Sequence, residues 1–240
     1  FGNQAYHFEI QKAHSELVIT AESEIQISDR DHDLNLDFGV SYGQALHALR
    51  NNRSQPILEA REYLLDSPMV EVNEELMAYA QPSFIPDRSL KSCVSELTTR
   101  IFDDFTYDPD FTTIATPLAE VLEHRRGVCQ DFAHLQVGCL RAVGIPAKYV
   151  SGYIETLPAP GEEKLVGADA THAWIAYFSP NEGWVEFDPT PGRSLPTPGV
   201  SSASPGFLYP FPDSGGTAWA EVEETDPASD GRPPFDETFR

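Results

Sequence analysis

The segment RGVCQDFAHLQVGCLRAVGIP, residues 126–146, predicts a helix that carries a cysteine in its first turn. Apolar side chains recur at helical spacing between Phe132 and Leu140, and Gly144 with Pro146 ends the pattern, so the predicted helix covers residues 129–143. The first N–H groups of a helix have no partner within it, and its dipole favours negative charge there. Cys129 therefore stands where the pKa of a thiol is lowered and the reactive thiolate is favoured.

Three strands are predicted after this helix, over residues 147–155, 172–178 and 184–188. The turn at residues 179–183 contains proline, asparagine and glycine and joins the last two strands into an antiparallel hairpin. The predicted core is a nucleophile helix packed on an antiparallel sheet, which is an α+β fold.

Further helices are predicted upstream of the cysteine, over residues 41–51, 56–65 and 73–80. A longer helix follows Asp87, and a short one covers residues 118–126. For the short helix, Thr116 is the predicted N-cap and Gly127 the predicted stop. Two other cysteines, Cys93 and Cys139, fall on apolar helical stripes and are predicted to be core residues.

The two ends of the chain differ from its middle. Alternating apolar residues between positions 6 and 27 predict two or three antiparallel strands. They begin abruptly at Phe1, so we expect that part of a β-rich region precedes it. The last 50 residues hold nine of the 20 prolines and six of the 16 glycines. We predict a β-rich N-terminal region with linking helices at residues 1–66, a catalytic core at 67–190 and an acidic Pro/Gly-rich tail at 191–240.

Composition excludes several classes of partner. The 240 residues include 38 acidic and 16 basic ones, and the net charge of -22 repels nucleic acid and anionic membranes. No apolar run approaches the roughly 20 residues that a membrane span needs. Three cysteines without C-x-x-C spacing argue against a disulfide framework and a thiolate zinc site. We therefore expect a reducing compartment, the cytoplasm.

Two residues on the predicted hairpin, together with Cys129, form a candidate catalytic triad. His172 begins one strand and Asp188 ends the next, so the hairpin makes them neighbours. A thiol enzyme requires a nucleophile, a proton acceptor and a carboxylate that fixes the imidazole tautomer, and these three residues can supply them. Asp169, three residues before His172 in a predicted loop, is the rival for the carboxylate role.

Four blocks of sequence resemble the bacterial and archaeal transglutaminase-like superfamily. They are residues 126–134, residues 140–153, Thr171-His172-Ala173-Trp174 and residues 183–190. The resemblance covers about residues 104–190 and implies a papain-like α+β core. It further implies Cys129 as nucleophile, His172 as general base and Asp188 as orienting carboxylate, acting without a cofactor. The N-terminal strands resemble the end of the β-rich region that precedes this core in many members.

Other readings of the same residues remain open. His124, Cys129 and His134 are spaced by five and suggest zinc, but Gly127 interrupts the helix between them. We expect Asp131 to cap the cysteine helix. Papain-type enzymes have an oxyanion-donating glutamine shortly before the cysteine, whereas the residue six positions before Cys129 is Glu123, an anion that cannot donate. Only the Cys129 backbone N–H is assigned to that role.

The sequence supports three functions. The first is a cysteine protease or amidase that acts on peptide or isopeptide bonds through an acyl-enzyme. The second is an acyltransferase that joins glutamine side chains to amines, because both reactions share the same intermediate. The third is a binding or scaffold protein with the same fold. The expected partners are protein or peptide substrates with an amide or glutamine side chain and, for transfer, an amine acceptor.

Overall fold

The computed structural model describes residues 9–10, 17–23, 36–113, 115–154, 170–190 and 218–224. The chain divides into two compact units, one formed by residues 1–30 and 210–240 and the other by residues 31–209. The helices over residues 41–66, which we predicted to go with the N-terminal region, lie in the second unit together with the core.

Among its described residues, the first unit contains one antiparallel pair of strands. Strand β1 (Leu17–Ser23) pairs with β7 (Ala218–Glu224), with Leu17 opposite Glu224. Strand β1 includes one of the predicted N-terminal strands. Ile10 has no regular secondary structure, and the other residues of the predicted N-terminal strands lie outside the described part of the chain. Strand β7 falls within the segment predicted as a tail, and its partner is about 200 positions away in the chain.

The helices of the second unit follow the predicted order. They are α1 (Tyr42–Asn51), α2 (Gln55–Ala60), the 3-10 helix η1 (Arg61–Leu64), α3 (Glu74–Ala80), the 3-10 helix η2 (Gln81–Ser83), α4 (Leu90–Asp104), α5 (Leu118–His124) and α6 (Cys129–Ala142). Ser41, Asn73 and Ser89 cap α1, α3 and α4, because each side chain accepts a hydrogen bond from a backbone N–H of the first turn.

The sheet of this unit has three antiparallel strands in the order β4, β5, β6. They are β4 (Ala147–Ile154), β5 (Ala170–Ser179) and β6 (Gly183–Phe187), close to the three predicted segments. Gly152 of β4 lies opposite His172 of β5, and Ile175 of β5 lies opposite Phe187 of β6. A second, parallel pair joins β2 (Thr106–Tyr107) to β3 (Arg126–Gly127) directly before α6.

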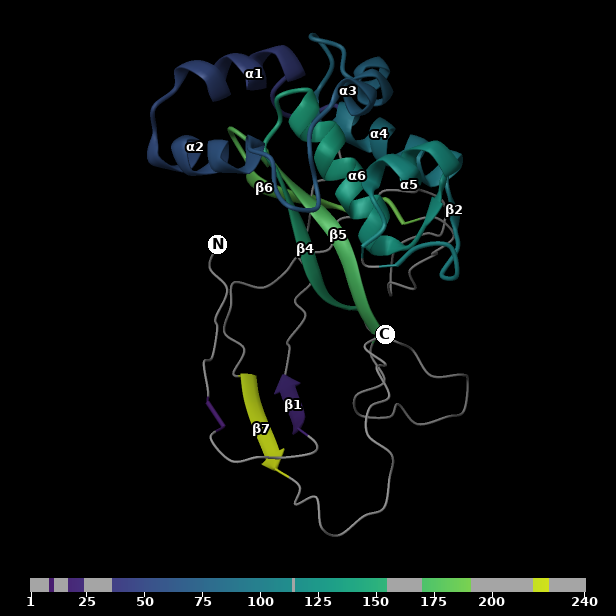
Figure 1. Cartoon of the computed structure of the whole chain (residues 1–240). Helices are drawn as coiled ribbons and strands as arrows, with labels where there is room; N and C mark the ends of the chain where they lie inside the picture. Colours follow the sequence, from purple (N-terminus) through teal and green to yellow (C-terminus); the bar gives the residue numbers. More distant parts are fainter. Residues whose placement is uncertain are drawn as a thin grey trace, which may run out of the picture. The chain divides into compact units, whose positions relative to one another are not determined.

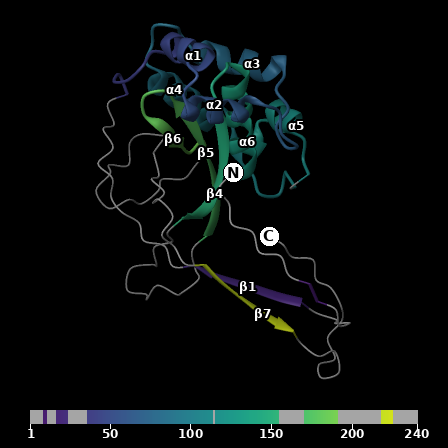
Figure 2. The same cartoon turned by 90° about the vertical axis from the view of Figure 1, so that its left-hand side faces the viewer.

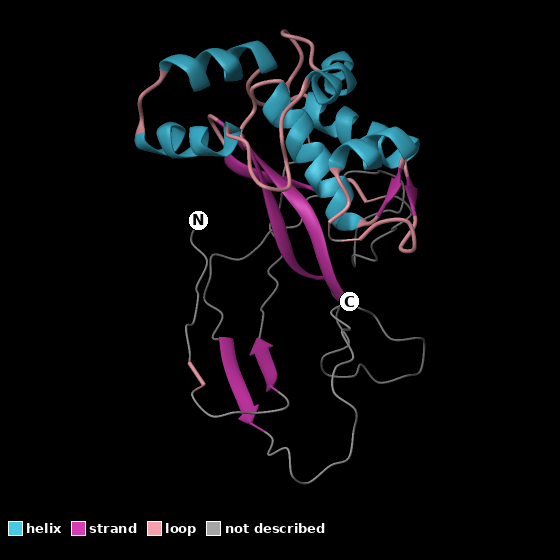
Figure 3. Cartoon of the chain, viewed as in Figure 1, coloured by secondary structure: helices cyan, strands magenta, loops and turns pink. Residues whose placement is uncertain are grey.

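Helix α6 is the centre of this unit, because it contacts β4 and β5 as well as α3, α4 and α5 (Figure 1). Its residues Phe132, Leu135 and Leu140 are fully buried. The helices gather at one end of the sheet, and β4 and β5 extend beyond them (Figures 2 and 3). The prediction of an α+β core with the cysteine helix packed on an antiparallel sheet is confirmed.

Helix α5 ends differently from the prediction. Its N-cap is Pro117, not Thr116, and it stops at Arg125, which has a positive φ of 57°, before Gly127 is reached. A non-glycine residue adopts this conformation at a cost, which favourable contacts must offset. The Arg125 guanidinium lies over the rings of Tyr79 and Phe105, at 4.8 and 5.0 Å from their centroids, and pairs with Asp104 at 3.0 Å. The early stop frees Arg126 and Gly127 to form β3.

Within the described residues, no helix combines the length and the apolar character that crossing a bilayer requires.

Candidate active site

Cys129 is the first residue of α6, as predicted. The residue before it, Val128, has extended backbone angles, and its N–H donates a hydrogen bond of 2.8 Å to Oδ2 of Asp131. Asp131 is 5% exposed, and its Oδ2 also accepts from the hydroxyl of Thr112 at 2.6 Å. The capping role predicted for Asp131 is confirmed, and the loop that carries Thr112 is attached to the same carboxylate.

Gly127 allows this cap to form. A Cβ atom at position 127 would lie 2.7 Å from Oδ2 of Asp131 and 2.9 Å from its Cβ, which is too close for any side chain. The carbonyl of Gly127 accepts from the N–H of Asp108 at 2.9 Å. The absence of a side chain at Gly127 therefore lets the Asp131 carboxylate reach back to Val128 and fix the approach of the chain to Cys129.

His172 and Asp188 meet across the β5–β6 hairpin. The Nε2 atom of His172 lies 2.6 Å from Oδ2 of Asp188, and the two residues are 3% and 8% exposed. Asp188 follows the last strand pair, Ile175 with Phe187, so it does not stand directly opposite His172. The two side chains meet diagonally, which is within the reach of neighbouring strands. The imidazole keeps Nδ1 for another partner because Nε2 is taken.

Thr190 holds the second oxygen of Asp188. Its backbone N–H and its hydroxyl donate to Oδ1 of Asp188, at 3.0 and 2.7 Å, and Thr190 is 3% exposed. Both carboxylate oxygens therefore have fixed partners. This role of Thr190 was not predicted from the sequence, although an aspartate that accepts from the backbone N–H two residues later is a common turn motif and Asp188-Pro189-Thr190 has that spacing.

The thiol of Cys129 interacts with the His172 side chain. Burial raises the pKa of Cys129, but a hydrogen bond from His172, its positive charge and the backbone N–H groups of Ala173 and Gln130 outweigh burial and lower the pKa below its usual value. Burial lowers the pKa of His172, and hydrogen bonds to Asp188 and Cys129 with their negative charges raise it to about 9. These opposite shifts favour a thiolate beside an imidazolium.

The other two cysteines have no such environment. Cys93 and Cys139 are fully buried, as predicted for core residues. Burial raises the pKa of both thiols. Among the three cysteines, only Cys129 combines partial exposure with a lowered pKa.

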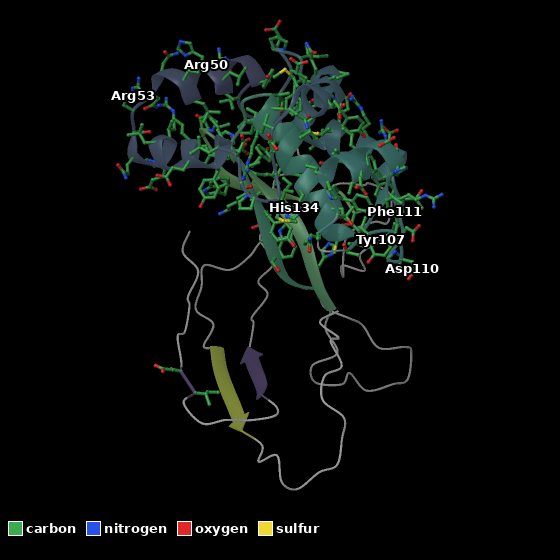
Figure 4. The ribbon with its side chains drawn as sticks, viewed as in Figure 1. Arg50, Arg53, Tyr107, Asp110, Phe111 and His134 are labelled. Atoms are coloured by element: carbon green, nitrogen blue, oxygen red, sulfur yellow. The ribbon has the colours of Figure 1, made fainter. Side chains whose placement is uncertain are left out.

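The two histidines near Cys129 in the sequence face different neighbours. The ring of His124 packs against Phe111, with centroids 5.4 Å apart, whereas the ring of His134 packs against Tyr149 at 4.8 Å. Figure 4 shows His134 where α6 passes β4 and β5, and Phe111 on the other side of the helix start. The part of the chain that the structure describes contains no group of three or more His, Cys, Asp or Glu side chains placed to hold a metal ion.

Neither of the other two carboxylates weighed from the sequence is placed with this cluster by the described residues. Asp169 lies outside the described residues. Glu123 is exposed on α5. The structure thus brings Cys129, His172 and Asp188 together in one chain of side chains, and their roles in catalysis stay a prediction.

Comparison with known families agrees with this fold. Residues 79–189 match the model of the Transglutaminase-like superfamily, and this segment includes α4, α6, the three-stranded sheet, Cys129, His172 and Asp188. An uncharacterized protein of Mycobacterium tuberculosis is 40% identical over 196 residues. That alignment covers 79% of this chain and 61% of the relative, so the chain spans less than two thirds of the mycobacterial protein.

Two similarities involve proteins of Pseudomonas aeruginosa. A protein-glutamine gamma-glutamyltransferase is 34% identical over 103 residues, which cover 39% of this chain and 15% of that protein. The crystal structure of the periplasmic domain of TgpA, with ethylmercury bound, aligns with a TM-score of 0.42 and 29% identity over 55% of this chain and 49% of that chain.

Proposed function

We propose that the transglutaminase-like core of this chain, which belongs to that superfamily through residues 79–189, is a thiol enzyme acting on amide bonds of proteins or peptides. The observation that carries the proposal is the continuous contact from Thr190 through Asp188 and His172 to the Cys129 thiol. A cysteine with only a structural role in the core would not need a neighbouring imidazolium or a position at a helix start, both of which stabilise a thiolate.

In the first half of the proposed reaction, the Cys129 thiolate attacks the carbonyl carbon of an amide. The π electrons move to the carbonyl oxygen, and a tetrahedral intermediate forms. When it collapses, the C–N bond breaks and the His172 imidazolium gives its proton to the departing nitrogen. The products are a thioester on Cys129 and a free amine or ammonia. Asp188 holds the imidazole so that the nitrogen remote from it faces the thiol.

The second half decides between hydrolysis and transfer. His172, now neutral, takes a proton from water or from an amine as that nucleophile attacks the thioester. The C–S bond then breaks, which releases the acid or the new amide and restores the Cys129 thiolate beside the His172 imidazolium. We place hydrolysis first, because water needs no dedicated site. Transfer to an amine is the second candidate, and the similarity of about 100 residues to a protein-glutamine gamma-glutamyltransferase supports it. A protein substrate with an accessible glutamine side chain suits both reactions.

The test is a single incubation with three readouts. The chain is mixed with a glutamine-rich protein such as β-casein and the fluorescent amine dansylcadaverine, and ammonia release, amine incorporation and backbone cleavage are measured. Ammonia without incorporation indicates an amidase, incorporation indicates a transferase, and fragments indicate a protease. Cys129→Ala should lose whichever activity is found. Cys139→Ala is the control, because it makes the same substitution at a fully buried cysteine, and it should keep the activity.

The result can also contradict the proposal. If the wild-type chain and Cys129→Ala give the same background in all three readouts, and if an alkylating agent shows no preference for Cys129, then the scaffold function is favoured. Circular dichroism of both variants shows whether each chain is folded.

A further inference from the structure

A large aromatic side chain lies next to the His172 imidazole on the same face of the sheet. Trp174 follows His172 by two positions on β5, and alternate residues of a strand point to the same side. The two rings are stacked, with centroids 5.9 Å apart and planes inclined by 26°. The indole therefore presents its face, and not its edge, to the imidazole.

The main apolar core does not account for the burial of Trp174. The side chain is 3% exposed, yet within the described residues the core around α6 does not include it. Its neighbours on β5, Ala173 and Ile175, belong to that core and point to the opposite face of the strand. The position of Trp174 is therefore set by contacts on the face that carries His172.

Glu186 fixes the polar end of the indole. Its Oε2 accepts a hydrogen bond of 2.9 Å from Nε1 of Trp174. The strand register supports this contact, because Glu186 of β6 lies opposite Ala176, the next residue after Trp174 on the same face of β5. Lys148 of β4 is the other partner of Ala176, and burial lowers the pKa of Lys148 while the charge of Glu186 raises it. The carboxylate thus lies near a cation as well as the indole N–H.

Asp188 restrains the imidazole in one direction only. The contact between Nε2 of His172 and Oδ2 of Asp188 is a single hydrogen bond, about which the ring can still tilt. A planar partner stacked on the face of the ring opposes that tilt. Because Phe187 is opposite Ile175, the same register places Asp188 level with Trp174. The indole and the carboxylate therefore act on the imidazole from adjacent positions.

The indole face also distinguishes the two protonation states of His172. An aromatic face attracts a cation within about 6 Å of its centroid, and tryptophan is the strongest aromatic partner. Imidazolium gains this attraction, whereas neutral imidazole does not. Among the described residues, the charged groups that face His172 are Asp188 from the end of β6 and Cys129 from α6, and β4 places Gly152 opposite it. Trp174 adds its attraction to theirs.

We propose that Trp174 is a positioning residue of the thiol site: anchored by Glu186, its indole holds the plane of the His172 ring and stabilises imidazolium over imidazole. The proposed reaction needs that imidazolium when His172 gives its proton to the departing nitrogen. The role rests on the proposed amide chemistry, but the effect of the stacked rings can be measured without a substrate.

The experiment compares Trp174→Leu with Trp184→Leu. Trp184 is the matched control because it lies on β6 opposite Phe178, six residues along β5 from His172. NMR follows the Cε1–H signals of the seven histidines against pH, and the His172 signal is the one missing from His172→Gln. The wild-type pKa of His172 is about 9. We expect its midpoint to fall by about one pH unit in Trp174→Leu and to stay in place in Trp184→Leu.

The pH profile of activity gives a second readout. Loss of the indole destabilises imidazolium equally beside the thiol and beside the thiolate, so the midpoint of Cys129 alkylation by iodoacetamide should not move. The alkaline limb of kcat/KM should move to a pH about one unit lower, while the acid limb stays in place. General loosening of the fold would instead lower kcat/KM over the whole pH range.

Milder variants grade the effect and serve if circular dichroism shows that Trp174→Leu is unfolded. Trp174→Phe keeps a smaller ring, so its His172 midpoint should lie between those of the wild type and Trp174→Leu. Glu186→Gln keeps an acceptor for the indole N–H and should match the wild type. Glu186→Leu removes that acceptor and should shift the His172 midpoint in the same direction as Trp174→Leu.

Three NMR results would overturn the inference. An unchanged His172 midpoint in every folded Trp174 variant shows that the indole does not stabilise imidazolium. An equal fall in Trp184→Leu assigns the effect to lost packing, and a full shift in Glu186→Gln assigns it to the charge of Glu186. None of these results depends on turnover, so the proposed function stays intact. A wild-type chain that turns over no amide contradicts the proposed function and with it the role of Trp174, whatever the midpoints.

Discussion

The carboxylate of Asp188 is divided between two partners, since Oδ2 contacts His172 and Oδ1 accepts both hydrogen bonds from Thr190. The 2.7 Å bond from the Thr190 hydroxyl fixes the plane of the carboxylate. That plane in turn determines the direction in which the imidazole of His172 points. Thr190 therefore influences the geometry of the thiol site indirectly, through its hydrogen bonds to Asp188.

We expect Thr190→Val to lower kcat/KM about fivefold. Valine keeps the shape and the backbone N–H but removes the hydroxyl donor, which is worth about 1 kcal/mol. Thr190→Ser restores that donor and should recover most of the activity. Equal losses in the two variants would mean that Thr190 acts through packing alone. Steady-state kinetics on the same substrate with both variants makes the comparison.

Asp188→Asn should lower kcat/KM about 10- to 1000-fold. The amide keeps the shape of the carboxylate but removes the charge that stabilises imidazolium, and it can donate to Nε2 and fix the wrong tautomer. The loss is smaller than for a serine triad, because the thiol is already partly ionised. Asp169→Asn is the parallel variant for the rival carboxylate. Normal activity in Asp188→Asn and collapse in Asp169→Asn would move the role to Asp169.

The reactivity of Cys129 should depend on pH in a way that follows from its ion pair. Because its pKa is lowered, alkylation by iodoacetamide should already be substantial at pH 7, and the rate should rise with a midpoint below 9. Activity also needs protonated His172, whose pKa is about 9, so kcat/KM should fall as the pH rises through about 9. The expected profile is a bell.

His172→Ala tests the sign of this effect. It removes the hydrogen bond and the charge that lower the pKa of Cys129 but leaves much of the burial that raises it. The midpoint of alkylation should therefore move to higher pH. A midpoint that stays in place would show that the helix start and the backbone N–H groups, not His172, lower the pKa.

Gly127→Ala should destabilise the fold by about 1–3 kcal/mol. The added Cβ would displace the carboxylate of Asp131 and break its bonds to Val128 and Thr112. Urea denaturation measures the free energy of unfolding of Gly127→Ala, Asp131→Ala and the double variant. Alanine at position 131 removes the carboxylate but keeps the Cβ at 2.9 Å, so Gly127→Ala should cost less, though still something, when Asp131 is already alanine. Fully additive losses would show that the clash with the carboxylate does not contribute.

Local signals were sufficient to predict the site but not all of its supports. The helix at Cys129 and the hairpin that carries His172 and Asp188 follow from short-range apolar spacing and turn residues. The contact between Thr112 and Asp131 joins residues 19 apart through a loop without periodicity, so the sequence gives no signal for it. The end of α5 was misplaced because glycine was the expected stop, whereas Arg125 takes the left-handed conformation with support from three distant residues.

The strand pair of the first unit could not be predicted from local sequence signals either. Strand β7 comes from a proline-rich segment in which no periodicity indicated a strand, and its partner β1 lies near the opposite end of the chain. Pairing over such a distance depends on the tertiary structure more than on the local sequence.

Because the three cysteines differ in exposure, the number of thiols that react quickly reports how much of a sample is folded. Cys93 and Cys139 are buried and have raised pKa values, whereas Cys129 is partly exposed and has a lowered pKa. At neutral pH, one folded molecule should consume one equivalent of Ellman's reagent rapidly and three only after denaturation. A ratio of rapid to total reagent of about one third then indicates a fully native preparation and a ratio near one an unfolded one, and fluorophores or affinity handles should attach at one known position without removal of another cysteine.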